Sequence, residues 1–95
     1  MKDRPLLEGD IRDYFLKVAK QYRAVVRKAT WYRRKGAPDW FVALNGSHFV
    51  ELKRPDGDLE DHQEREIKLL LRKGVDVRVL DSYEGIEDFF EEIKK

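Results

Sequence analysis

The sequence of 95 residues lacks cysteine altogether, contains only two histidines, and has no long apolar run. Without cysteine the chain forms neither a disulfide framework nor a thiolate metal site, and His48 and His62 alone make a zinc site improbable. Any metal ion would therefore have oxygen ligands. The longest apolar run extends only from Trp40 to Leu44, whereas a transmembrane helix needs about 20 apolar residues.

The first residues also lack the continuous apolar segment of a secretory signal peptide, because Met1 to Pro5 lead directly into an amphipathic stretch. We therefore expect a cytoplasmic protein without a membrane partner. The length allows one hydrophobic core, so residues 1–95 are expected to form a single domain.

Acidic residues are missing from one segment of the chain. The protein has 20 Lys and Arg against 19 Asp and Glu, but none of the acids lies between Leu16 and Pro38. This asymmetry predicts one face that attracts phosphates, and the alternative is a solvated basic helix and strand edge. The basic residues of this segment are Lys17, Lys20, Arg23, Arg27, Lys28, Arg33, Arg34 and Lys35.

Hydrophobic spacing and turn residues predict seven elements in the order α-β-β-β-α-β-α. Asp3 and Pro5 are start signals for the first helix, Gly74 caps the second, and Ser82 caps the third. The helix before the last strand permits a parallel crossover, so we expect an α/β fold with a mixed four-stranded sheet flanked by helices. The expected ranges are helix 5–21, strands 24–30, 39–44 and 47–53, helix 60–73, strand 75–80 and a helix after 82.

Two carboxylates and an ammonium group fall at the ends of the two middle strands. Asp39 opens one strand, while Glu51 and Lys53 end the next and share a face because side chains alternate along a strand. Neighbouring carboxylates favour a hard divalent cation such as Mg²⁺, and Lys53 could then orient a water or stabilise charge on a phosphate. The alternative is an ordinary solvated pair. Gln63 lies four residues before Ile67 and is expected to point inward near these strand ends.

The loop at Asn45-Gly46 decides whether the carboxylates meet. A two-residue type I′ turn would pair Leu44 with Ser47 and place Asp39 and Glu51 on opposite faces. A three-residue loop of residues 44–46, with a type I turn and a left-handed Gly46, pairs residue 43 with Ser47 and Asp39 with Glu51. We expect the three-residue loop, because a shared metal requires it.

The spacing of Pro38-Asp39 and Glu51-Leu52-Lys53 within this element order resembles the PD-(D/E)XK nuclease superfamily. Residues 36–40 (GAPDW), residues 49–53 (FVELK), Gln63, Gly74 and Glu8 together resemble the VRR-NUC domain. The resemblance implies a restriction-endonuclease-like αβββαβα core and a metal-dependent DNA nuclease. Small stand-alone members, often of phage origin, resemble Holliday junction resolvases, which implies a bacterial or phage-infected cell.

Carried over by position, the resemblance implies that Asp39 and Glu51 bind Mg²⁺ or Mn²⁺, with the backbone carbonyl of Leu52 as a further ligand. Lys53 would be the catalytic lysine. Two helix residues would complete the site, Glu8 as a metal ligand and Gln63 as a catalytic support. The sequence departs from the family at Glu60, where Ser or Thr is common.

The expected function is a structure-selective DNA endonuclease, Holliday junction resolvase-like, acting on branched DNA as a homodimer whose two sites make two symmetric breaks. The alternatives are a flap- or end-processing repair nuclease and a catalytically idle DNA-binding domain of the same fold. Trp31 and Tyr32 could stack on unpaired bases or belong to the core, and together with Phe89 and Phe90 they are candidates for a dimer interface if exposed. The expected DNA-binding residues are Arg27, Lys28, Arg33, Arg34 and Lys35.

Overall fold

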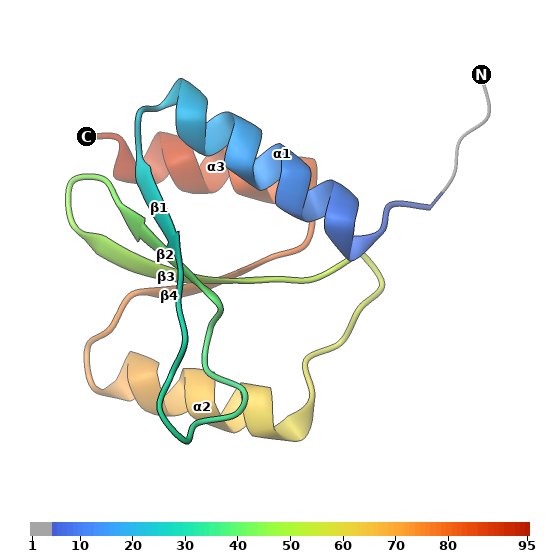
Figure 1. Ribbon diagram of the computed structural model, residues 1–95, viewed down its shortest axis with the longest axis vertical. Helices are drawn as coiled ribbons and strands as arrows, with labels where there is room; N and C mark the ends of the chain where they lie inside the picture. The colour runs from blue at the N-terminus through green and yellow to red at the C-terminus, as the bar shows by residue number, and fades with distance from the viewer. Residues whose placement is uncertain (1–4) are drawn as a thin grey trace.

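The computed structural model describes residues 5–95 and confirms the predicted order of helices and strands (Figure 1). Asp3, expected as a helix start signal, lies outside the described residues. The elements are α1 (Glu8–Gln21), β1 (Val25–Lys28), β2 (Trp40–Ala43), β3 (Ser47–Leu52), α2 (Asp61–Arg72), β4 (Val77–Leu80) and α3 (Tyr83–Ile93).

Some elements are shorter than expected because local backbone contacts set their ends. α1 begins at Glu8 rather than at residue 5, and the backbone N–H of Leu7 donates to Asp10 Oδ2 at 2.8 Å. Gly74 has a φ of 92° and ends the turn after α2, so β4 begins at Val77 rather than at residue 75. The third helix is capped as predicted, since the Ser82 side chain accepts the N–H of residue 85.

The strands form one mixed sheet in the order β1-β2-β3-β4, in which β3 and β4 are parallel and the other pairs antiparallel. Ala43 lies opposite Ser47, which confirms the register expected for a three-residue loop. The expected type I turn is wrong, because Asn45 at φ 50° and Gly46 at φ 133° both have positive φ. A type I turn requires negative φ at its second central residue.

Contacts outside the turn hold this loop in place. His48 lies on β3 with Nδ1 2.6 Å from Asp76 Oδ2 and Nε2 3.0 Å from the backbone oxygen of Leu44. The Asn45 side-chain amide donates to the backbone oxygen of Ile93 at 3.1 Å. The β2–β3 loop is therefore anchored to the start of β4 and to the end of α3.

Helices cover both faces of the sheet, with α1 and α3 packed on one face and α2 on the other (Figure 1). Phe89 and Phe90 belong to the hydrophobic core and are only 2% and 0% exposed. These two residues were candidates for a dimer interface only if exposed, and their burial removes them from that set. Among residues 5–95, no helix is both long and apolar enough to cross a membrane.

Candidate active site

Asp39 enters the site from a loop that is fixed just before β2. Pro38 is buried, and its backbone oxygen accepts a hydrogen bond of 2.7 Å from Trp31 Nε1. The backbone oxygen of Asp39 accepts the N–H of Ala29 at 2.7 Å, which holds the residue against the end of β1. When the β2–β3 register is continued by one residue, Asp39 lies opposite Glu51. The two carboxylates therefore share a face of the sheet, as the predicted loop length requires.

Glu51 is the buried carboxylate of this pair, with 4% of the residue exposed. Burial and then the charge of Asp39 raise the pKa of Glu51 to about 7, while the charge of Lys53 and a hydrogen bond from the Asp39 backbone act in the opposite direction. No donor among residues 5–95 forms a hydrogen bond with Glu51 Oε1, although that oxygen is buried. A buried carboxylate oxygen without a donor is costly unless a cation or another positive group approaches it.

Gln63 is held between Glu51 and the start of α2. Its Nε2 donates to Glu51 Oε2 at 3.2 Å, and its Oε1 accepts the backbone N–H of Glu60 at 2.9 Å. Because the oxygen of the amide is used at the helix start, the NH₂ group is the part that faces Glu51. The departure at Glu60 does not displace the helix, which begins at Asp61 with Glu60 as its N-cap.

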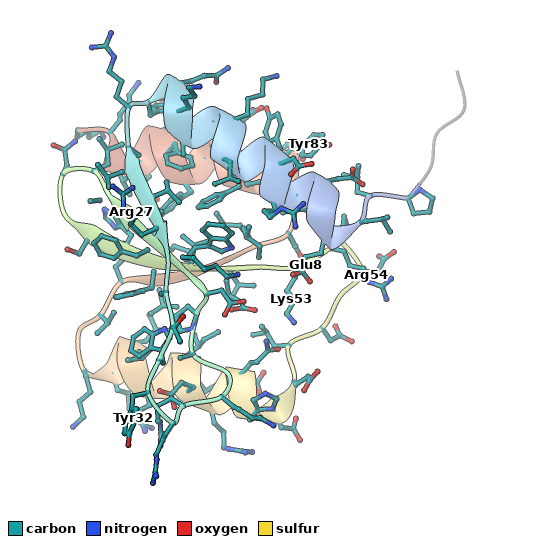
Figure 2. All side chains as sticks on the ribbon, in the orientation of Figure 1. Glu8, Arg27, Tyr32, Lys53, Arg54 and Tyr83 are labelled. Atoms are coloured by element: carbon teal, nitrogen blue, oxygen red, sulfur yellow. The ribbon has the colours of Figure 1, made fainter. Side chains whose placement is uncertain are left out.

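A small pocket of about 150 Å³ gathers residues from four parts of the chain. Glu8 at the start of α1, Asp39 before β2 and Leu52 at the end of β3 all line it, whereas Glu51 is not among the lining residues. Lys53 follows Leu52 and is partly exposed. Figure 2 shows Glu8 and Lys53 on the same side of the molecule, between α1 and α2.

The structure separates Lys28 from Arg27, although both were expected to contact DNA. Lys28 also lines this pocket, with Nζ 3.7 Å from Asp39 Oδ2 and 4.7 Å from the centre of the Trp40 ring. Arg27 lies opposite Phe41, so it belongs to the other face of the sheet, and its Nη1 donates to the backbone oxygen of residue 26. The two cations therefore do not form one continuous surface.

The donor set suits a hard cation with few protein ligands. No three His, Asp or Glu side chains in the described part of the chain are arranged as a ready-made metal site. Mg²⁺ needs no such cage, because it retains several waters and binds through one or two carboxylates. The unpaired Oε1 of Glu51 and the neighbouring Asp39 provide such a pair.

Arg33, Arg34 and Lys35 line a second, larger pocket of about 580 Å³ on the α2 side of the sheet. Basic residues of α2, which were not predicted to bind DNA, line the same pocket. The spacing of these basic residues at three and four positions could have indicated a basic helix face, but glutamates lie between them in the sequence. The basic residues from α2 are Arg65, Lys68 and Arg72.

The two aromatic residues before the basic loop have different environments. Trp31 packs on Phe49 with ring centres 5.1 Å apart and is half-buried, so it belongs to the fold. Tyr32 is 83% exposed and lies beside α2 in Figure 2, with Arg33 over its ring at 5.5 Å. Of the two, only Tyr32 is placed to contact a nucleic acid base or a partner chain.

Gly36 lies in the basic loop where the loop packs against the start of α2. We expect Gly36→Ala to destabilise the protein by about 1–3 kcal/mol or more. Its φ is 84°, and an added Cβ would lie 2.8 Å from the His62 backbone oxygen and 2.9 Å from Gln63 Cα. Gly74→Ala is the matched control, because Gly74 has a φ of 92° but nothing within 4 Å of the added carbon. Urea unfolding should show a larger loss for Gly36→Ala, and equal losses would contradict a close contact.

A family model and two solved structures that resemble this chain all point to the same family. The model of the VRR-NUC domain matches residues 8–84. A solved structure described as a VRR_NUC domain is 30% identical, with a TM-score of 0.79, covering 88% of this chain and 94% of its own. A second, described as a VRR_NUC domain protein, shares the fold at 13% identity and a TM-score of 0.76, covering 95% of this chain and 89% of its own. No curated protein matches this sequence.

Proposed function

Because the chain belongs to the VRR-NUC domain family, a family of nucleases, we propose that it hydrolyses phosphodiester bonds in branched DNA with the help of Mg²⁺ or Mn²⁺. The observation that carries this proposal is the buried Glu51 carboxylate with an unpaired oxygen beside Asp39. Such a pair would be destabilising in a domain that only binds DNA, and it is what a divalent cation requires.

The residues have separate roles in this proposal. Asp39 and Glu51 would hold the cation, with the backbone carbonyl of Leu52 and the Glu8 carboxylate as further ligands. The bound cation would supply positive charge to the scissile phosphate and lower the pKa of a nearby water. In the hydrolysis, the attacking water gives up a proton as its oxygen bonds to phosphorus, one phosphodiester P–O bond breaks, and the departing oxygen takes up a proton.

Lys53 and Gln63 would prepare the site for this step. The ammonium group of Lys53 would orient the attacking water or stabilise the charge that develops on the phosphate. Gln63 is a positioning residue, because it fixes Glu51 Oε2 while leaving Oε1 without a donor. Lys28 would move away from Asp39 when a cation binds, since the present contact is between two exposed groups.

The proposed substrate is a four-way junction, cut by a homodimer. Each chain contributes one Asp39, Glu51 and Lys53, and therefore one break for each binding event. A two-fold dimer would supply two sites with the symmetry of the junction. Because Phe89 and Phe90 are buried, the exposed Tyr32 is the aromatic residue that we propose for the dimer interface.

We expect purified protein to cut a labelled four-way junction at two symmetric positions in Mg²⁺ or Mn²⁺, and to cut nothing in chelator. Duplex, flap and junction DNA should be compared under the same conditions, together with sedimentation of the protein with and without junction. Two copies on each junction would support the dimer. A single copy that trims flaps or ends would replace the resolvase proposal, and no cleavage of any substrate would indicate a binding domain.

A further inference from the structure

The pocket between residues 33–35 and α2 is lined mainly by charged side chains. Its volume is about 580 Å³, and six basic side chains line it. The acidic side chains near it include Glu66, which also lines it, Glu64, whose Oε1 is 4.0 Å from Lys68 Nζ, and Glu60, whose Oε1 is 3.5 Å from Nδ1 of the lining His62. The six basic residues are Arg33, Arg34, Lys35, Arg65, Lys68 and Arg72.

A buried carboxylate holds one of these cations in position. Glu66 has a side chain that is 10% exposed, and its Oε1 accepts from Arg34 Nη2 at 2.9 Å. A guanidinium group has five N–H donors, so Arg34 retains donors for an anion in the pocket. The pairing with Glu66 reduces the freedom of the Arg34 side chain, which lowers the entropic cost of binding.

The α2 contribution forms a row along one side of the helix. Arg65, Lys68 and Arg72 are three and four residues apart, which places them on the same helix face. Gln63, two residues before Arg65, contacts Glu51 in the candidate active site. From Gln63 to Arg72 the helix rises about 14 Å, and phosphates of one DNA strand recur about every 3.4 Å along a duplex.

We propose that this pocket binds the sugar-phosphate backbone of the DNA arm that leaves the cleavage site, through internal phosphates contacted by residues 33–35 and the basic face of α2. The inference rests on the proposed nuclease function and identifies the surface that holds the substrate. The basic residues of α1 lie on the other side of the sheet and take no part (Figure 1). The sequence-based surface from Lys17 to Lys35 is therefore divided, and only its last part contacts this arm.

The test compares two variants that each lose three positive charges. The first replaces Arg65, Lys68 and Arg72 by glutamine, and the matched control replaces Lys17, Lys20 and Arg23 by glutamine. Affinity for a blunt duplex is measured by fluorescence anisotropy in chelator, across a salt series from about 50 to 200 mM. Duplexes with and without terminal phosphates are included, because an end-binding pocket would distinguish them.

Each lost phosphate contact should reduce the slope of log affinity against log salt by about 0.9, so the α2 variant should lose up to about 2.7. The control should retain both slope and affinity, and terminal phosphates should make no difference. An unchanged slope in the α2 variant, an equal loss in the control, or dependence on a terminal phosphate would overturn the proposal. If the triple variant does not fold, Arg65→Gln and Arg72→Gln alone should each lose about 0.9.

This experiment is independent of cleavage. Protein that binds through α2 but cuts no DNA would contradict the proposed function, and would still show that the basic face of α2 holds duplex DNA. Protein that cuts junctions, but whose α2 variant binds duplex normally, would contradict this inference alone.

Discussion

Asp39→Asn should slow DNA cleavage by about 100- to 1,000-fold or more while leaving the fold and DNA affinity almost unchanged. The substitution removes a charge that the proposed cation requires but keeps the shape of the side chain. Asp39 is 53% exposed and its ion pair with Lys28 is also exposed, so its loss costs little stability. Lys53→Gln should have the same outcome, because Lys53 is partly exposed and would serve the chemistry.

Single-turnover cleavage with excess protein isolates this effect from product release, and anisotropy in chelator gives the DNA affinity. Asp88→Asn is the control, because Asp88 is an exposed acid on α3 and its loss changes the net charge equally. A fall in melting temperature large enough to account for the lost activity would contradict the assignment of Asp39 to catalysis.

Glu51→Gln should abolish cleavage and at the same time stabilise the protein above neutral pH. Glu51 has a pKa of about 7 in the folded protein, against 4.5 for an unperturbed glutamate. The folded state therefore binds more protons than the unfolded state between these values, and stability falls as pH rises through this range. At pH 8 the raised pKa lowers the free energy of unfolding by at most roughly 3 kcal/mol. Glutamine does not ionise, so Glu51→Gln would remove this loss.

Urea unfolding in chelator at pH 4.5 and pH 8 measures this difference. The unchanged protein and Glu51→Gln should be similarly stable at pH 4.5, and Glu51→Gln should be the more stable of the two at pH 8. Adding Mg²⁺ at pH 8 should stabilise the unchanged protein, because a ligand bound only by the folded state raises its stability, and it should have little effect on Glu51→Gln. An equal pH dependence in both proteins would show that burial of the Glu51 charge is not costly.

Local sequence signals were sufficient for the order of elements and for a mixed sheet. Turn residues, caps and hydrophobic spacing marked each helix and strand, and the helix between β3 and β4 permitted the parallel pair that the structure shows. The β2–β3 register needed a chemical argument as well, because Asn45-Gly46 alone favours the two-residue turn. The requirement that Asp39 and Glu51 share a face selected the observed register.

The remaining features depend on contacts between residues far apart in the chain. The unpaired oxygen of Glu51 results from the packing of β3 against α2, which no local pattern reports. The basic face of α2 was missed because Glu64 and Glu66 alternate with its cations, and only the fold shows that Glu66 turns inward to Arg34. Phe89 and Phe90 share a helix face with other apolar residues, but their burial required α1 as well as the sheet.

The β2–β3 loop has a consequence for how this nuclease can change its length. Solvent-exposed turns usually tolerate an inserted or deleted residue, and here the strands rather than the turn set the face on which each carboxylate lies. Val42 and Val50 are fully buried on one face of the sheet, so Asp39 and Glu51, at odd spacings from them, lie on the other. A change in loop length that keeps both valines in the core therefore keeps the two carboxylates together, whereas a slip of either strand by one residue would expose a valine and separate the carboxylates.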